Sequence, residues 1–321
     1  MSSILALGEC MVELSVVNEE GNKDPTINMS FAGDTYNSLV YGKRWVENLQ
    51  PYYFSAIGKD RFSVLMRSAW KENQIDATYV LSTENNNVGL YAIQNDESGE
   101  RYFDYWRSQS AASQLMKLYQ QQKTALEWPQ IDLLYFSGIS LGMLPDEDKV
   151  MLLDFVEEIR AKGTRIAFDP NYRKALWENK EHAIAWLTKA YNASDLVLVG
   201  LEEHQHLLEQ NSVAEVLSFC RQCGCSEIVI KAAEQGVFGY EKDKQVAHVA
   251  FDPAPVQLDA TAAGDSFAGV YLSTRLNGSE IGSSIQQASD VARFVVQNRG
   301  AIINEEVFQQ FKWQYLLDFE A

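Results

Sequence analysis

The stretch DATAAGDSFAGVYL, residues 259–272, places two aspartates around a run of very small residues, directly before an apolar segment. Ala262, Ala263 and Gly264 leave their backbone N–H groups accessible, and the residues from Asp265 to Gly278 have the spacing of an amphipathic helix. The start of a helix presents unpaired N–H donors and the positive end of the helix dipole. The stretch therefore predicts a binding site for an anion, above all for a phosphate.

Asp265 allows two interpretations. An aspartate at a helix start can simply cap the helix by accepting a hydrogen bond from the backbone. A catalytic role is favoured by the second aspartate, Asp259, six residues upstream, by the small residues between them, and by the late position in an alternating chain. In that role Asp265 accepts the proton of a substrate hydroxyl as its oxygen attacks phosphorus. The N–H groups of Ala262, Ala263 and Gly264 then stabilise the transferring phosphoryl group.

The rest of the chain alternates apolar runs with helical patterns. Strands are predicted over residues 4–9, 52–58, 131–139, 165–170, 195–200 and 227–232. Helices are predicted over residues 34–49, 61–75, 148–163, 180–194 and 213–224, and Asp34 or Thr35 is expected to cap the first. This alternation predicts a mostly parallel sheet with helices on both faces, and ligands bound beyond the carboxyl ends of its strands.

Two segments, at about residues 12–32 and 87–107, break the alternation. The first contains two strand-like runs around a polar stretch, and the second has the pattern of a β-hairpin. Tyr91, Tyr102, Tyr105 and Trp106 make this hairpin too aromatic for an ordinary solvated edge. We predict a small sheet that covers the mouth of the main sheet as a lid, inserted into a single domain over residues 1–321. A decorated β-meander without a lid role is the alternative.

Composition excludes several functional classes. The 321 residues carry a formal net charge of -17, which argues against a nucleic-acid or anionic membrane surface. A small anion needs only a few local donors, so it stays compatible with this charge. No stretch approaches the roughly 18 apolar residues of a membrane span, and the first ten residues lack the basic start of a secretory signal. A soluble cytoplasmic protein is expected.

The cysteines and histidines show no catalytic or metal pattern. Cys220, Cys223 and Cys225 lie close together, but no second ligand pair follows at zinc-finger spacing. We expect free thiols at the end of a helix, a glycine turn and the start of a strand. His204 and His206 are expected on the solvated face of a helix.

The opening stretch resembles the D-T-x-G-A-G-D signature of the ribokinase-like (PfkB) carbohydrate kinases. Four further segments resemble motifs of this family in the family's order: FAGDTYN at 31–37, DPNYR at 169–173, GLEE at 200–203 and KAAEQG at 231–236. They resemble, in turn, the G-G-x-x-x-N sugar motif, the D-x-N-x-R element, the N-x-x-E element that organises magnesium, and the K-x-G-x-x-G nucleotide loop. The resemblance spans nearly the whole chain.

The chain departs from these motifs at several positions. Ala32, Ala233 and Ala262 stand for glycines, Ala260 for threonine and Gly200 for asparagine. Because alanine does not readily adopt a positive φ, we expect Ala262 in a backbone conformation that suits an L-residue. Its N–H group is retained in any case.

The resemblance implies a ribokinase-like three-layer sandwich, with a mostly parallel central sheet flanked by helices and a small β-sheet lid. It implies an ATP-dependent phosphotransferase with an alcohol group as acceptor, Mg²⁺ at the phosphates, and a possible homodimer through the lid. It also implies site roles: Asp265 as base; Gly33, Asp34 and Asn37 on sugar hydroxyls; Tyr91 and Tyr105 lining the pocket; Asn171 and Arg173 between both ligands; Lys231, Ala233 and Gly236 bordering the nucleotide; and Glu203 near magnesium through water.

Further segments, such as GECMVELS at 8–15 and NYRKALW at 171–177, resemble the family members that act on keto-deoxy sugar acids. The carboxylate of such a substrate matches the planar fork of an arginine, so Arg107 and Arg173 are the candidate clamps. Arg107 as a solvating charge, Arg173 as a structural partner and Tyr91 as lid core are the alternatives. A neutral-sugar kinase of the fructokinase or ribokinase type needs no such clamp, and a non-catalytic sugar-binding regulator is a further alternative.

Overall fold

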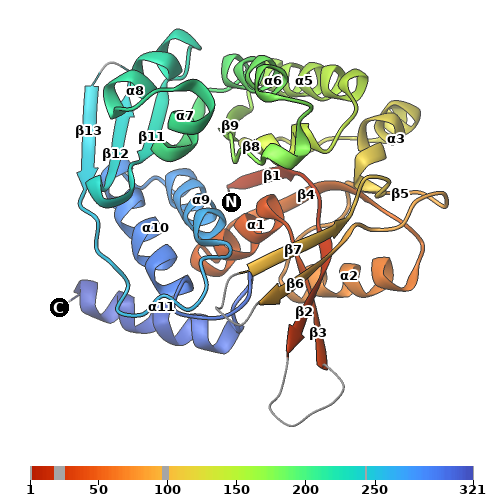
Figure 1. Cartoon of the computed structure of the whole chain (residues 1–321), viewed down its shortest axis with the longest axis horizontal. Coiled ribbons are helices and arrows are strands. Elements are labelled where there is room, and N and C mark those ends of the chain that lie inside the picture. Colours follow the sequence, from red (N-terminus) through yellow and green to blue (C-terminus); the bar gives the residue numbers. More distant parts are fainter. Residues whose placement is uncertain (1, 18–25, 96–100, 243, 321) are drawn as a thin grey trace.

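The apolar runs of the sequence form one large sheet. The computed structural model describes residues 2–17, 26–95, 101–242 and 244–320 (Figure 1). Within them the strand order of this sheet is β13-β12-β11-β10-β9-β8-β1-β4-β5, with only β12 and β13 antiparallel to their neighbours. The strands are β1 (Ser3–Leu7), β4 (Gln50–Ile57), β5 (Val80–Ser82), β8 (Leu133–Ser137), β9 (Arg165–Asp169), β10 (Leu196–Gly200), β11 (Glu227–Lys231), β12 (Val237–Glu241) and β13 (Lys244–Val249).

Helices cover both faces of this sheet, because successive side chains of a strand point to opposite sides. In β1, Ile4 and Ala6 join one core, and Leu5 and Leu7 join the other. The first core is covered by α1 (Asp34–Trp45), α2 (Arg61–Glu72), α9 (Ala263–Leu276), α10 (Ile281–Val295) and α11 (Glu305–Glu320). The second is covered by α3 (Leu115–Gln122), α4 (Gly138–Gly142), α5 (Asp146–Ala161), α6 (Lys180–Asn192), α7 (Leu201–Leu208) and α8 (Val213–Gln222). The predicted three-layer α/β sandwich is confirmed.

Short elements and helix ends complete the description. Four 3₁₀ turns, η1 (Ala112–Gln114), η2 (Lys123–Ala125), η3 (Lys174–Leu176) and η4 (Ala233–Gln235), occur in the described loops. Helix α1 begins at Asp34 after Gly33, so Asp34 lies in the first turn and the predicted side-chain cap is absent. Helix α9 begins at Ala263, two residues before the predicted start. Helices α3, α4, α10 and α11 were not predicted.

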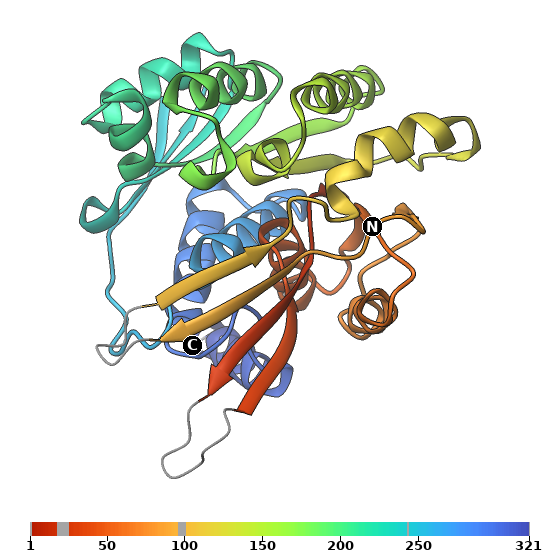
Figure 2. The same cartoon turned by 45° about the vertical axis from the view of Figure 1, so that its right-hand side comes forward.

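The two segments that break the alternation pair in a second, smaller sheet of order β3-β2-β6-β7. Its strands are β2 (Met11–Val17), β3 (Thr26–Ala32), β6 (Leu90–Asn95) and β7 (Arg101–Trp106). The predicted hairpin is confirmed, since β6 and β7 pair antiparallel. This sheet projects from the core (Figures 1 and 2), and Ile27 and Trp106 on it are 55% and 60% exposed.

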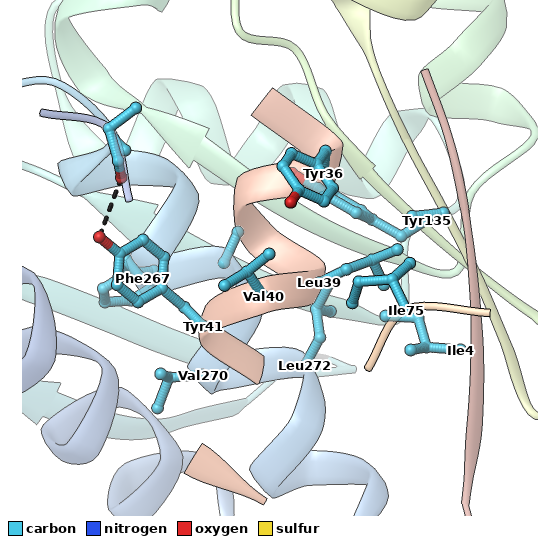
Figure 3. Packing of buried hydrophobic residues seen from close by; sticks show 14 of the residues in the cluster. Ile4, Tyr36, Leu39, Val40, Tyr41, Ile75, Tyr135, Phe267, Val270 and Leu272 are labelled. Atoms are coloured by element: carbon cyan, nitrogen blue, oxygen red, sulfur yellow. Dashed lines mark hydrogen bonds between the residues drawn. The ribbon is translucent and has the colours of Figure 1, made fainter. Parts of the chain in front are cut away.

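Helices α1 and α9 pack unusually closely, and this contact positions the site. A Cβ atom added to Gly269 of α9 would lie 2.0 Å from the backbone oxygen of Ser38 in α1. Figure 3 shows Leu39 and Val40 of α1 packed among Phe267, Val270 and Leu272 of α9. A side chain at position 269 would force the two helices apart, so the glycine fixes the spacing between the segments that carry Asp34 and Asp265.

Candidate active site

Polar side chains gather where the parallel strands of the main sheet end. Glu9 follows β1, Ser137 and Asp169 end β8 and β9, Glu203 lies in the first turn after β10, and Lys231 ends β11. Because the carboxyl ends of parallel strands meet at one edge of the sheet, these residues share that edge. The starts of α1 and α9 come to the same edge, as the contacts below show.

Side-chain hydrogen bonds join the first and last motifs of the sequence. Asn37 Nδ2 donates to Asp265 Oδ2 at 2.8 Å. Asp34 Oδ2 accepts from Ser137 Oγ at 2.5 Å and from Asn171 Nδ2 at 3.1 Å. These residues come from four distant parts of the chain, so the structure brings Asp34 and Asn37, predicted on the sugar side, and Asn171, predicted between both ligands, together with the predicted base.

Asp265 is the third residue of α9, and its side chain does not cap the helix. The capping interpretation is therefore wrong. Burial and the nearby charge of Asp34 raise the pKa of Asp265 to about 7, against the opposing effects of the Asn37 hydrogen bond and the Arg173 charge. A carboxylate with a pKa in this range is a far better proton acceptor near neutral pH than an ordinary aspartate.

The backbone before Asp265 departs from the sequence prediction. Ala262 has φ 60° and ψ 14°, which is the left-handed region, so the expectation of an ordinary L-residue conformation is wrong. Asp259 accounts for this, because its carboxylate accepts from Thr261 N and Gly300 N at 2.8 Å each and so fixes the loop. Ala262 itself is buried in the core. Tertiary contacts thus override the local preference of alanine.

The start of α9 leaves space for a ligand. A Cβ atom added to Gly264 would find no atom within 4 Å. Among the described residues, neither Ala262 N–H nor Gly264 N–H has an acceptor, whereas Ala263 N–H donates to Ala260 O at 3.3 Å. The open backbone and free donors fit a phosphate group.

A second charged network lies beside this helix start. Lys231 Nζ donates to Asp169 Oδ2 at 3.1 Å, and Asp169 Oδ1 accepts from Asn171 N at 3.0 Å. Desolvation lowers the pKa of Lys231, but the charges of Asp169 and Glu203 outweigh it and raise this pKa. Asp169 was not predicted as a site residue, although it opens the DPNYR segment at a strand end, which was the available signal.

Glu203 is turned toward the backbone, where its Oε1 accepts from Tyr172 N at 3.1 Å. Burial and the charge of Asp169 raise its pKa. Within the described ranges, no three His, Cys, Asp or Glu side chains converge as a set that could hold a metal ion. The single carboxylate of Glu203 fits magnesium, because this ion keeps several waters and is bound through one or two carboxylates together with substrate phosphates.

The remaining residues predicted on the nucleotide side lie in the loops that follow β9 and β11. Ala233 is exposed and has a positive φ of 47°, and Gly236 has φ 87°. A Cβ atom on Gly236 would lie 2.2 Å from Val249 O, so the loop between β11 and β12 needs this glycine. Arg173 is exposed and its side chain forms no hydrogen bond or ion pair with any described residue, so it is accessible to a ligand.

The predicted lid residues differ in accessibility. Tyr91 is 6% exposed, and its hydroxyl donates to the buried Glu13, whereas Tyr105 is 53% exposed and stacks on Tyr91 at 5.7 Å. Arg107 Nη2 lies 2.6 Å from Oε2 of Glu9. The predicted clamp therefore has a counter-ion within the protein, which the sequence prediction missed although Glu9 directly follows the first strand.

The clustered cysteines, Cys220, Cys223 and Cys225, precede the start of β11 and so lie at the opposite end of that strand from Lys231. The four cysteines are buried free thiols, and Gly224, with φ 89°, turns the chain between α8 and β11 as predicted. His204 is buried between Tyr191 and Gln210, so its predicted place on a solvated helix face is wrong. No helix in the described part of the chain has the length and apolar character needed to span a bilayer.

The three-layer sandwich with its mostly parallel sheet, the open start of α9 and the carboxylate of Asp265 beside it are the features of a phosphotransferase of the carbohydrate kinase class. The family model of the pfkB family carbohydrate kinases matches residues 1–307, and the chain belongs to this family. The resemblance seen in the motifs is confirmed.

Two relatives and one solved structure give the particular similarity. A 2-dehydro-3-deoxygluconokinase of Haemophilus influenzae is 33% identical over 318 residues, covering 98% of this chain and 100% of that protein. The 2-dehydro-3-deoxygluconokinase of Escherichia coli K12 is 34% identical over 307 residues, covering 94% of this chain and 97% of that protein. A fructokinase from Xylella fastidiosa with bound ATP superposes with a TM-score of 0.78 at 20% identity, covering 93% of each chain. The predicted ribokinase-like fold is confirmed.

Proposed function

We propose that this chain is an ATP-dependent sugar-acid kinase that phosphorylates 2-dehydro-3-deoxy-D-gluconate on its terminal hydroxyl, giving the 6-phosphate. The relatives that cover nearly the whole chain carry that activity in their names. The observation that carries the proposal is the contact of Asn37 with Asp265 beside the open backbone of Gly264. It sets a sugar motif, a base and a phosphate site side by side.

Asp265 accepts the proton of the attacking hydroxyl. Asn37 orients the carboxylate through its 2.8 Å hydrogen bond, and Asp34 and Asn37 bind hydroxyls of the sugar beside it. Phosphoryl transfer has a loose transition state in which the nucleophile loses its proton late, so alignment matters more than basicity. The elevated pKa of Asp265 additionally favours proton acceptance near pH 7.

The start of α9 binds the transferring phosphoryl group. The N–H groups of Gly264 and Ala262 have no acceptor among the described residues. Arg173 adds a positive charge on the same side, and its side chain has no partner among these residues. Donors fixed before the reaction stabilise the developing charge without reorganisation. Lys231, Ala233 and Gly236 border the nucleotide. Glu203 serves magnesium through water, and the ion, when bound, neutralises phosphate charge.

The substrate's carboxylate distinguishes a sugar acid from a neutral sugar. Arg107, which follows the lid strand β7, and Arg173, which follows the core strand β9, are the candidate arginines, because a planar guanidinium matches a carboxylate. Tyr105, one of the accessible aromatic residues of the lid, lines the pocket, while the buried Tyr91 supports it. The exposed residues of the small sheet are compatible with a homodimer through the lid.

A panel of sugar acids and neutral sugars with ATP and Mg²⁺ tests the proposal. We expect kcat/KM for 2-dehydro-3-deoxy-D-gluconate to exceed that for fructose or ribose by at least about 10³-fold, because a site built for a polar group rejects substrates that lack it. Preferred turnover of fructose or ribose would establish the neutral-sugar alternative. Binding of the sugar acid without any phosphorylation would instead establish a non-catalytic regulator.

A further inference from the structure

Glu9 carries a buried charge that the proposed mechanism does not use. It lies two residues after β1 and is only 2% exposed. A buried carboxylate is costly unless a counter-charge lies close. Arg107 supplies it, with Nη2 at 2.6 Å from Oε2, and its side chain is 13% exposed. The pair joins the end of a core strand to the end of the lid hairpin.

The contact is an ion pair without aligned hydrogen bonds. Neither carboxylate oxygen of Glu9, nor Nη2 of Arg107, meets a described group in hydrogen-bonding geometry, although the charges are in contact. Both side chains therefore keep hydrogen-bonding capacity in the absence of substrate. Arg107 can hold a second carboxylate without first breaking an aligned, two-bond fork.

Two glycines make the space for this pair. A Cβ atom on Gly89 would lie 2.7 Å from Glu9 Oε1 and 3.3 Å from Arg107 Cβ. A Cβ atom on Gly33 would lie 2.0 Å from Glu9 O, so the backbone of Glu9 packs directly against the residue before Asp34. The ion pair consequently lies between the lid and the sugar motif.

Asp34 is the neighbouring carboxylate that competes for Arg107. The charge of Arg107 already acts on Asp34, lowering its pKa against the larger raising effect of burial. Ser137 and Asn171 both donate to Oδ2 of Asp34, and a backbone hydrogen bond from Thr35 also reaches this carboxylate. A guanidinium released from Glu9 would have the Asp34 carboxylate as its neighbouring counter-charge, and an Asp34–Arg107 pair would withdraw both groups from the sugar.

We infer that Glu9 is a positioning residue for substrate recognition: it holds the Arg107 guanidinium off Asp34 and keeps it available for the carboxylate of the sugar acid. This inference rests on the proposed function. Glu9 acts through Arg107 and does not itself touch the reacting atoms. It therefore affects the binding of substrates that carry a carboxylate and leaves the phosphoryl-transfer step at Asp265 unchanged.

Glu9→Gln tests the inference, because it keeps the shape of the side chain and removes its charge. With 2-dehydro-3-deoxy-D-gluconate and saturating ATP, we expect KM to rise about tenfold, while kcat stays within about threefold. In the background of Arg107→Ala, which itself raises KM, adding Glu9→Gln should change KM less than about twofold, since the group that Glu9 positions is gone. The measurements are steady-state kinetics of the four proteins and sugar-acid titrations by calorimetry.

Glu227→Gln is the matched control. Glu227 is also a buried glutamate paired with arginines, with Oε2 at 2.8 Å from Arg275 Nη2, but it begins β11, at the opposite end of the strand from Lys231. The Glu227→Gln protein should lose thermal stability without a change in KM. This result would separate general destabilisation from a local effect on substrate binding. An unchanged or lowered KM in Glu9→Gln, or an equal rise in the Arg107→Ala background, would overturn the inference. Absence of sugar-acid turnover by the unmodified chain would overturn the proposed function instead.

Discussion

The proposed sugar-binding side and the proposed phosphate-binding side of the site are ordered by different means. On the sugar side, side chains from distant segments bond to one another, as Asp34 does with Ser137 and Asn171. On the proposed phosphate side, a Cβ atom added to Gly264 would meet no described atom within 4 Å, and the exposed backbone itself would form the site. The first arrangement depends on the chemical groups of particular residues. The second depends on backbone conformation and on the absence of a Cβ atom, so it tolerates different residues provided the chain keeps its shape.

Asp265 belongs to both sides, because it bonds to Asn37 and lies in the first turn of α9. Asp265→Asn should therefore give the largest effect of any single exchange in the site. The amide keeps an oxygen that accepts from Asn37 but cannot take a proton, so we expect kcat to fall by ~10²–10⁴ with little change in thermal stability. Turnover at the original rate in this variant, measured with saturating sugar acid and ATP, would exclude Asp265 as the base.

Gly269→Ala tests whether the spacing of α1 and α9 holds the two sides in register. The new Cβ atom would meet the backbone of Ser38 at 2.0 Å, which no side-chain rotation can relieve. We expect a loss of about 1–3 kcal/mol or more in the free energy of unfolding, with a fall in activity as Asn37 moves from Asp265. Urea unfolding and kinetics measure the two effects.

Gly264→Ala is the contrasting change in the same helix. Open space surrounds this position, and alanine favours the helix by up to ~1 kcal/mol, so stability should stay the same or rise. The methyl group would occupy the place of the phosphoryl group, and kcat/KM should fall about tenfold or more. A stable and fully active Gly264→Ala protein would contradict a phosphate site at the start of α9.

The sequence predicted the parts of the molecule that depend on local pattern. The apolar runs predicted β1, β4 and β8 to β11, and the small residues before α9 predicted its open start. The contacts of Glu9, Ser137 and Asp169 could not be predicted, because each depends on strands far apart in sequence meeting at one edge. The backbone conformation of Ala262 was predicted wrongly. Its positive φ is imposed by the hydrogen bond from Gly300 N to Asp259, two residues 41 positions apart, which overrides the preference of alanine.

The pH dependence of the reaction should show how Asn37, on the proposed sugar side, affects the pKa of Asp265. Only ionised Asp265 accepts a proton, and its pKa is raised to about 7, so kcat/KM should rise about tenfold per pH unit below that value and level off above it. Asn37→Ala removes the hydrogen bond that lowers this pKa, so its inflection should move to higher pH. An inflection that stays in place in Asn37→Ala would show that another group limits the profile.

Ala262→Gly should give the smallest effect and the opposite sign to most exchanges. Alanine in the left-handed region costs ~1–2 kcal/mol, part of which glycine loses again through the entropy of the unfolded chain. We therefore expect a net gain of about 0.5–1 kcal/mol in the free energy of unfolding, measured by urea titration. The gain would locate the strain on the phosphate side, where tertiary contacts impose a conformation that the residue does not favour.

Ala185→Gly supplies the matched control, because Ala185 is exposed within α6 and has no positive φ. There the same exchange should cost ~1 kcal/mol. Opposite signs at the two positions would establish that the backbone on the phosphate side is held by Asp259 and its partners and not by local propensity. Equal losses would mean that Ala262 sits in an ordinary helical conformation, and the phosphate side would then differ from the sugar side only in lacking side chains.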